Sequence, residues 1–169
     1  YHAADSYVAK LIRSGFKVAI AEQMEDPVLA KGVVMREVIR IVTPGTILEA
    51  DMLSPKTNNY LAAVYFQDND CGFAYVDIST GEFKVTELSA GEIMGEIARI
   101  QPAECLVPDG AGSDLVQNLK DKNIHISNYE LPKQAEEIKR RLLEYFKIKS
   151  LHSFGLNGSL EETAAALAV

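Results

Sequence analysis

Apolar and polar side chains follow two different periods along the first part of the chain. An apolar helical face follows Asp5, a helix-capping residue, and stops before Gly15. Residues 16–21 and 33–42 are rich in apolar and β-branched side chains, which predicts two strands, and a Thr-Pro-Gly-Thr stretch ends the second. Between them, residues 26–32 begin with Asp-Pro and end with glycine, which predicts a short helix.

A different pattern begins after about one third of the chain. Three apolar stretches, residues 60–66, 71–78 and 82–88, are separated by short turns rich in Asp, Asn, Ser, Thr and Gly. Strands joined by turns this short must run antiparallel. A helix over residues 93–100 and a short buried strand over residues 103–107 follow, which predicts a right-handed crossover to a parallel strand.

Helical and extended segments continue to alternate toward the end of the chain. Residues 115–119 predict a short helix and residues 124–126 another strand. Pro132 then begins the longest predicted helix, whose other faces are basic. Its apolar face consists of Ile138, Leu142, Tyr145 and Phe146. Ser159 and Glu162 stand at capping-box spacing, which predicts the start of a further, truncated helix.

These patterns predict an α/β chain in four parts. Residues 1–46 form a partial mixed α/β domain, residues 47–58 a linker without a clean period, residues 59–158 a second domain, and residues 159–169 the truncated helix. The second domain has three antiparallel strands followed by alternating helices and parallel strands. This order is typical of an RNase H-like fold, a mixed sheet flanked by helices.

Charge is distributed unevenly between these parts. Apolar residues make up 47% and charged residues 24%, as in ordinary globular proteins, and no apolar run is long enough to span a membrane. Residues 1–46 hold six basic and five acidic residues, a net charge of +1, and residues 47–169 hold eleven and nineteen, a net charge of −8. If the chain contacts DNA, the contact is therefore expected from the first part. Cys71 and Cys105 lack metal-binding spacing and are expected to be buried, reduced thiols, which favours the cytoplasm.

Two groups of short segments carry a family resemblance. The first group consists of residues 1–3 (YHA), 18–23 (VAIAEQ), 26–27 (DP), 31–32 (KG) and 40–46 (RIVTPGT). The second group consists of residues 77–83 (DISTGEF) and 102–104 (PAE). In this order and spacing they resemble the MutS family of DNA mismatch-repair proteins, and the pairing of RIVTPGT with a later DISTGEF is the specific part.

The resemblance implies that residues 1–46 are the end of a mismatch-binding domain and residues 59–158 a connector domain. MutS proteins are dimeric clamps that bind mismatched duplex DNA, use ATP with Mg and recruit MutL. Neither the family's Phe-x-Glu mismatch wedge nor a phosphate loop of the G-x-x-x-x-G-K-[ST] type occurs in this sequence. We therefore expect a connector and docking module that is not an enzyme and has no cofactor or metal of its own. Mismatched DNA, MutL and the second MutS subunit are expected partners of the intact parent.

The resemblance also indicates candidate DNA-proximal residues. In the family, the segment that matches Tyr1 and His2 lies near the DNA backbone, whose phosphates a hydroxyl or an imidazole can contact. Lys31, Arg36 and Arg40 are basic candidates for the same surface. The alternative for each of them is an ordinary solvated surface position or, for Arg40, an ion pair with a carboxylate.

Two further sites distinguish the possible functions. Arg140 and Arg141 form a basic patch on the last long helix, either a solvated face or a docking surface for MutL. Many RNase H-like enzymes hold metal ions with several carboxylates, so a metal-dependent nuclease using Asp77 is the alternative function. Asp77 is expected instead to accept hydrogen bonds from amides of the turn that follows it. The isolated His125 and His152 are expected to be structural. A stand-alone DNA-binding protein is disfavoured by the net charge of −7.

Overall fold

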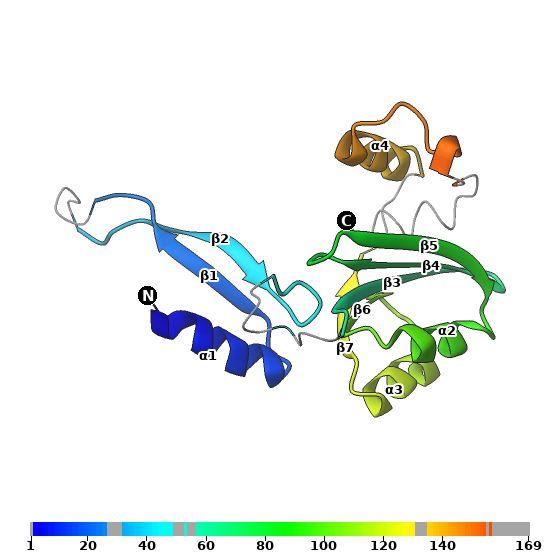
Figure 1. Ribbon diagram of the computed structural model, residues 1–169, viewed down its shortest axis with the longest axis horizontal. Helices are drawn as coiled ribbons and strands as arrows, with labels where there is room; N and C mark the ends of the chain where they lie inside the picture. The colour runs from blue at the N-terminus through cyan, green and yellow to red at the C-terminus, as the bar shows by residue number, and fades with distance from the viewer. Residues whose placement is uncertain are drawn as a thin grey trace.

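The chain folds into a small N-terminal unit and a larger second unit (Figure 1). The computed structural model describes residues 2–26, 32–48, 53, 57–130, 135–154 and 156, with the backbone alone at residues 2, 3, 135, 136 and 153. The predicted helix at residues 26–32, most of the predicted linker and the predicted helix at residues 159–169 lie outside the described residues.

The N-terminal unit is a helix packed on a two-stranded antiparallel sheet. It consists of α1 (His2–Arg13), β1 (Val18–Gln23) and β2 (Arg36–Val42). Ile12, Val42 and Ile47 are buried together between the helix and the sheet. The predicted helix and both predicted strands are confirmed, although each strand begins two or three residues later than the sequence pattern indicates.

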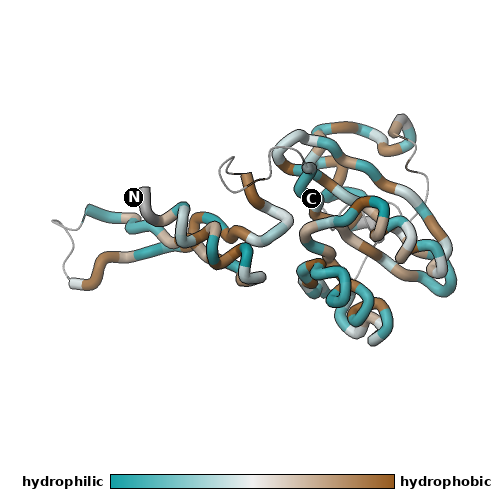
Figure 2. The backbone as a smooth tube through the Cα atoms, turned by 60° about the horizontal axis from the view of Figure 1, so that its bottom comes forward, coloured by the Kyte–Doolittle hydropathy of each residue, from teal (hydrophilic) through white to brown (hydrophobic). Residues whose placement is uncertain are grey.

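The second strand of this hairpin exposes apolar side chains. Val38, Ile39 and Ile41 on β2 are each more than half exposed, and Val33 just before the strand is 99% exposed. Figure 2 shows these apolar stretches along the hairpin. A two-stranded sheet with a helix on one side leaves its other side bare, so apolar residues of β2 that point to the bare side have no second layer to pack against.

The second unit is built on a five-stranded mixed sheet. Its strands are β3 (Tyr60–Gln67), β4 (Asp70–Asp77), β5 (Glu82–Ser89), β6 (Glu104–Pro108) and β7 (His125–Tyr129). They lie in the order β5-β4-β3-β6-β7, with β3, β4 and β5 antiparallel and β3, β6 and β7 parallel. The predicted antiparallel meander and parallel crossover are confirmed, and the order is that of an RNase H-like fold.

Helices cover both faces of this sheet (Figure 1). One face carries α2 (Ile93–Ile100) and α3 (Ser113–Asp121), and the other carries α4 (Ala135–Phe146), which is followed by a short 3-10 helix, η1 (His152–Phe154). Ile97 and Leu119 pack on the first face, and Leu142 packs beside β5 on the second. Covering both faces explains why the middle strands are continuous apolar runs.

The structure corrects two local predictions. Tyr145, placed by the sequence on the apolar face of α4, is 61% exposed, and its ring lies edge-on to Phe146. Phe146 itself contacts Phe83 of the sheet only from the margin of that face. The sequence Ser89-Ala90-Gly91-Glu92 at the start of α2 predicts a capping box with reciprocal bonds. Glu92 accepts hydrogen bonds from the backbone and hydroxyl of Ser89, but Ser89 caps no backbone N–H of the helix, so only half of the box is formed. No helix in the described part of the chain is long and apolar enough to cross a membrane.

Candidate functional site

The buried polar side chains of the described residues lie together where the two units meet. They are Thr43, Asp77, Glu104 and Ser127, each less than 9% exposed. Thr43 follows β2, Asp77 ends β4, Glu104 begins β6 and Ser127 lies in β7. Burying a polar group is costly unless it is hydrogen-bonded, so four such groups at one place mark a built polar site. We call this site the interdomain joint.

The first component of the joint is the turn at residues 43–46. Thr43 N–H donates to Thr46 Oγ1 at 2.9 Å, and Thr46 N–H donates to the Thr43 carbonyl at 3.1 Å. The two threonine hydroxyls also lie 2.9 Å apart. Pro44 fixes the backbone between them. These bonds hold the turn in one shape at the end of β2 and confirm the break in secondary structure that the sequence predicts here.

The second component is a pair of side chains that bind one peptide group of this turn. Gly45 N–H donates to Glu104 Oε2 at 3.0 Å, and Asn59 Nδ2 donates to the Pro44 carbonyl at 2.9 Å. The donor N–H and the acceptor carbonyl belong to the same trans peptide group, and they point in opposite directions. The Pro44–Gly45 peptide group is therefore held from both sides by the second unit, an arrangement that we call the peptide clamp.

Each half of the clamp is supported from within the sheet. Ser127 Oγ donates to Glu104 Oε1, which gives the buried carboxylate a second donor. On the other side, Asn59 N–H donates to Asp77 Oδ2 at 3.1 Å, and Ser79 donates to Asp77 Oδ1 through its amide at 2.9 Å and its hydroxyl at 2.6 Å. Burial alone would raise the pKa of Asp77, but these hydrogen bonds together lower it below its usual value.

Steric space at the joint favours glycine at position 45. A Cβ atom there would lie 2.9 Å from Glu104 Cβ and 3.0 Å from both Cβ and Cδ1 of Leu61. Gly45 does not adopt the left-handed backbone conformation, so the reason for glycine is close approach rather than φ. The backbone of the turn thus lies directly against the first residues of β3 and β6.

The end of α1 makes a further approach to the second unit. Gly15, in the left-handed conformation with φ 81°, ends the helix. A Cβ atom at Gly15 would lie 3.9 Å from Nδ1 of His125, the first residue of β7. The Nε2 atom of the same ring is buried without a hydrogen-bond partner. His125 therefore lies partly buried beside the end of α1, a location that fits the structural role expected for it.

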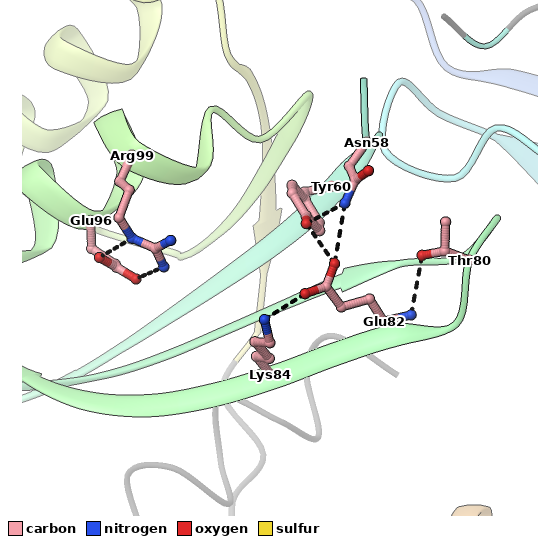
Figure 3. A network of polar contacts seen from close by, with 7 residues as sticks. All are labelled: Asn58, Tyr60, Thr80, Glu82, Lys84, Glu96 and Arg99. Carbon is pink, nitrogen blue, oxygen red and sulfur yellow. Dashed lines mark hydrogen bonds and ion pairs between the residues drawn. The ribbon is translucent and has the colours of Figure 1, made fainter. Parts of the chain in front are cut away.

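A second polar network flanks the joint on the surface (Figure 3). Glu82 Oε2 accepts from the Tyr60 hydroxyl at 2.7 Å and from Asn58 Nδ2 at 3.1 Å, and Lys84 Nζ lies 2.6 Å from Glu82 Oε1. Lys84, followed by Tyr60, lowers the pKa of Glu82. These groups are partly or largely exposed, and exposed pairs contribute little stability. The network binds the side chain of Asn58, the residue before Asn59 of the clamp, to Glu82 of β5.

The predicted DNA-proximal residues differ in what the structure describes of them. Tyr1 and Lys31 lie outside the described residues, and of His2 only the backbone at the start of α1 is described. Arg36 and Arg40 lie on β2 and line a hollow of about 980 Å³ between α1 and the hairpin, together with carboxylates of α1 and β1. Contact of these residues with DNA stays a prediction.

Arg140 and Arg141 lie on the exposed side of α4, on the opposite face of the sheet from α2 and α3. Arg140 Nε lies 3.7 Å from Glu144 Oε1, one helical turn further on. The patch is therefore accessible to a partner from solvent. Its role in docking stays a prediction.

Asp77 has the role that its turn predicts. Both of its oxygens accept hydrogen bonds, and they bind the start of β3 and the turn after β4. Among the described residues, no three His, Cys, Asp or Glu side chains are grouped to hold a metal ion. Cys71 and Cys105 are buried, free thiols, as expected, and burial raises their pKa to about 11 and about 12.

Sequence reasoning does not identify the peptide clamp. Asn59 stands in no motif, and Gly45 is visible in the sequence as part of a turn and of the RIVTPGT segment, neither of which indicates its partners. One signal is available at Glu104, a charged residue at the start of the otherwise apolar stretch AECLV. A charge in a buried strand requires a partner, and that partner comes from a turn 59 positions earlier.

The fold and the joint together define an RNase H-like domain to which a smaller α/β unit is attached through a polar turn. Two domain families match the chain: MutS domain I over residues 1–51 and MutS domain II over residues 59–169. The chain therefore belongs to the MutS family of DNA mismatch-repair proteins, and the resemblance found in the sequence is confirmed.

Two relatives illustrate the similarity. The DNA mismatch repair protein MutS of Halothermothrix orenii is 45% identical over 173 residues, which cover 99% of this chain and 19% of the relative. The MutS of Syntrophomonas wolfei is 48% identical over 165 residues, which cover 92% of this chain and 19% of the relative. The chain thus spans about a fifth of the length of the curated relatives it matches.

A solved structure is also similar to part of the chain. RuvC of T. thermophilus, in complex with a Holliday junction substrate, matches 64% of this chain and 90% of its own, with a TM-score of 0.43 and 11% identity. The RNase H-like assignment of the second unit rests on its strand order and on the family matches.

Proposed function

We propose that this part of a MutS protein couples the mismatch-binding domain to the rest of the subunit and offers a docking surface to a repair partner. The observation that carries the proposal is the interdomain joint, where the buried polar side chains of the described residues meet. A linker that served only as a tether would not require a peptide group held from both sides. Membership of the MutS family supplies the repair context.

The intact parent has wider functions in this proposal. It binds mismatched duplex DNA as a dimer of MutS subunits, uses ATP and Mg in a part of the protein other than this one, recruits MutL, and works in the cytoplasm. Residues of the N-terminal unit, namely Tyr1, His2, Lys31, Arg36 and Arg40, lie near the DNA backbone. The near-neutral charge of this unit, beside the acidic second unit, supports that assignment.

We also propose that this segment has no catalytic activity of its own. The carboxylate that the nuclease alternative requires, Asp77, is engaged by the backbone and hydroxyl donors of its turn. The two family matches concern domains I and II alone. Incubation of the chain with duplex DNA and magnesium is expected to give no cleavage above background, and cleavage that Asp77→Ala removes would overturn this part of the proposal.

The proposed docking surface lies on α4. Arg140 and Arg141 are exposed there and stand on a domain with excess negative charge, so they offer a local basic patch to an acidic partner surface. A binding titration of the chain with purified MutL tests this proposal. We expect saturable binding that is lost in Arg140→Glu/Arg141→Glu.

A matched control keeps the net charge change the same. Lys120 and Lys122 are exposed at the end of α3, on the other face of the sheet. Lys120→Glu/Lys122→Glu should therefore leave MutL binding unchanged. Equal loss in both double variants would show a general charge effect and remove the docking site from α4. Absence of binding by the unmodified chain would remove the docking role from this segment.

A further inference from the structure

The two units have separate apolar cores. The N-terminal core gathers around Ile12, Val42 and Ile47, whereas the cores of the second unit gather on the two faces of its sheet. Among the described helices and strands, those of one unit do not pack extensively on those of the other. Within the described residues, the turn at residues 43–46 therefore carries the main connection between them.

We propose that the peptide clamp is a releasable latch that fixes the orientation of the mismatch-binding unit on the connector. Closed, it holds the Pro44–Gly45 peptide group between Glu104 and Asn59. Open, it no longer fixes the orientation of the N-terminal unit relative to the second unit. This inference rests on the proposed coupling function and names the residues that perform it.

The peptide clamp can open because it is made of hydrogen bonds and not of a large apolar interface. An apolar interface that separates exposes its whole area to water, and the cost rises with that area. A clamp made of hydrogen bonds loses its partners to water instead, because the carboxylate, the amide and the peptide group are all hydrated when they separate. The closed state is specific in geometry, and the open state leaves no polar group without a partner.

The two halves of the clamp make different contributions. The bond from Gly45 to Glu104 involves a buried carboxylate and is the stronger kind. The bond from Asn59 to Pro44 joins neutral groups. Asn59 is nevertheless the better position to change, because its backbone N–H still binds Asp77 after its side chain is shortened. Asn59→Ala therefore opens one side of the latch and leaves the second unit intact.

Pairs of spin labels measure the opening directly. Lys10 on α1 and Lys120 on α3 are exposed positions on the two units, and both native cysteines are fully buried, so labels attach selectively at Lys10→Cys and Lys120→Cys. We expect one narrow distance distribution in the otherwise unmodified chain. Asn59→Ala should raise the open fraction about two- to tenfold, and Glu104→Ala about ten- to hundredfold.

Conservative and distant variants separate the latch from general destabilisation. Glu104→Gln keeps an acceptor for Gly45 and should retain the narrow distribution. Asn128→Ala and Glu87→Ala change exposed residues of β7 and β5 and should do the same. Hydrogen exchange at the Gly45 amide gives a second readout, which should accelerate by the same factor as the open fraction rises.

The latch is overturned if Asn59→Ala and Glu104→Ala keep the narrow distribution and the slow exchange at Gly45 while the circular dichroism spectrum stays unchanged. It is equally overturned if the unmodified chain already shows a broad distribution. The MutL titration is a separate measurement. If the chain fails to bind MutL but the clamp variants broaden the distance distribution, the docking role is excluded and the latch is supported. If the chain binds MutL but the clamp variants keep the narrow distribution, the docking role is supported and the latch is excluded.

Discussion

Replacing Gly45 by alanine adds one carbon atom at the closest approach between the two units. The new Cβ would lie 2.9 Å from Glu104 Cβ and 3.0 Å from Leu61 Cβ, closer than carbon atoms pack. Glu104 begins β6 and Leu61 belongs to β3, and the two residues are paired in the sheet. Neither Cβ can move without moving its strand, so the turn has to shift.

The cost follows from what the shift disrupts. Overpacking a closely packed site costs roughly 1–3 kcal/mol. Moving the turn instead breaks its hydrogen bond to a carboxylate, worth roughly 1.5–3 kcal/mol net. Alanine also reduces the freedom of the unfolded chain, which returns about 0.4–1 kcal/mol. We therefore expect Gly45→Ala to lower the free energy of unfolding, or of opening the joint, by about 1–2 kcal/mol.

Urea unfolding, together with hydrogen exchange at residue 45, measures both quantities. Gly95 provides the matched control, because it lies inside α2 and a Cβ atom added there would have nothing within 4 Å. Gly95→Ala should stabilise the chain by about 0.5–1 kcal/mol, the ordinary gain for this exchange in a helix. A Gly45→Ala variant that is as stable as Gly95→Ala, with unchanged exchange at residue 45, would refute the close approach at the joint.

Two further predictions concern the second unit. Asp77→Asn should cost about 1–3 kcal/mol at neutral pH, because one acceptor oxygen becomes a donor facing other donors. The folded pKa of Asp77 is lowered from its ordinary 3.8, so the stability contributed by the ionised side chain is present above pH 3.8 and is lost as pH falls through the folded pKa. In urea unfolding, the stability difference between the unmodified chain and Asp77→Asn should therefore shrink in acid. A difference that stays constant with pH would contradict this. Leu142→Ala should lower the free energy of unfolding by about 2–5 kcal/mol, because it leaves a cavity under α4. Glu144→Ala, at an exposed position of the same helix, should change thermal unfolding little. Equal effects of the two changes would show that α4 is not anchored by its apolar face.

Much of the architecture could be predicted from local pattern. The meander of β3, β4 and β5 is visible as apolar stretches separated by turns that admit only antiparallel neighbours. The role of Asp77 was also predictable, because an aspartate before Ser-Thr-Gly accepts bonds from amides two and three residues further on. These properties depend on residues close together in sequence, so the sequence alone expresses them.

Periodicity was less reliable at the margins of elements. Tyr145 has the spacing of the apolar face of α4, yet it is 61% exposed and its ring lies edge-on to Phe146. The exposed apolar side chains of β2 also show that an apolar pattern does not ensure burial. An apolar strand pattern predicts burial, but only a second layer of structure can provide it.

The sequence by itself determined the order of helices and strands, the RNase H-like class of the second unit and the family. These properties depend on local periodicity, turns and contiguous motifs, all of which are visible in the sequence. The tertiary structure alone decided that Gly45, Asn59 and Glu104 form one site. The physical reason is distance along the chain: a peptide group after β2 meets the first residues of β3 and β6 only when the whole sheet has formed. The partner of a buried carboxylate is then chosen by the fold rather than by its neighbours in sequence.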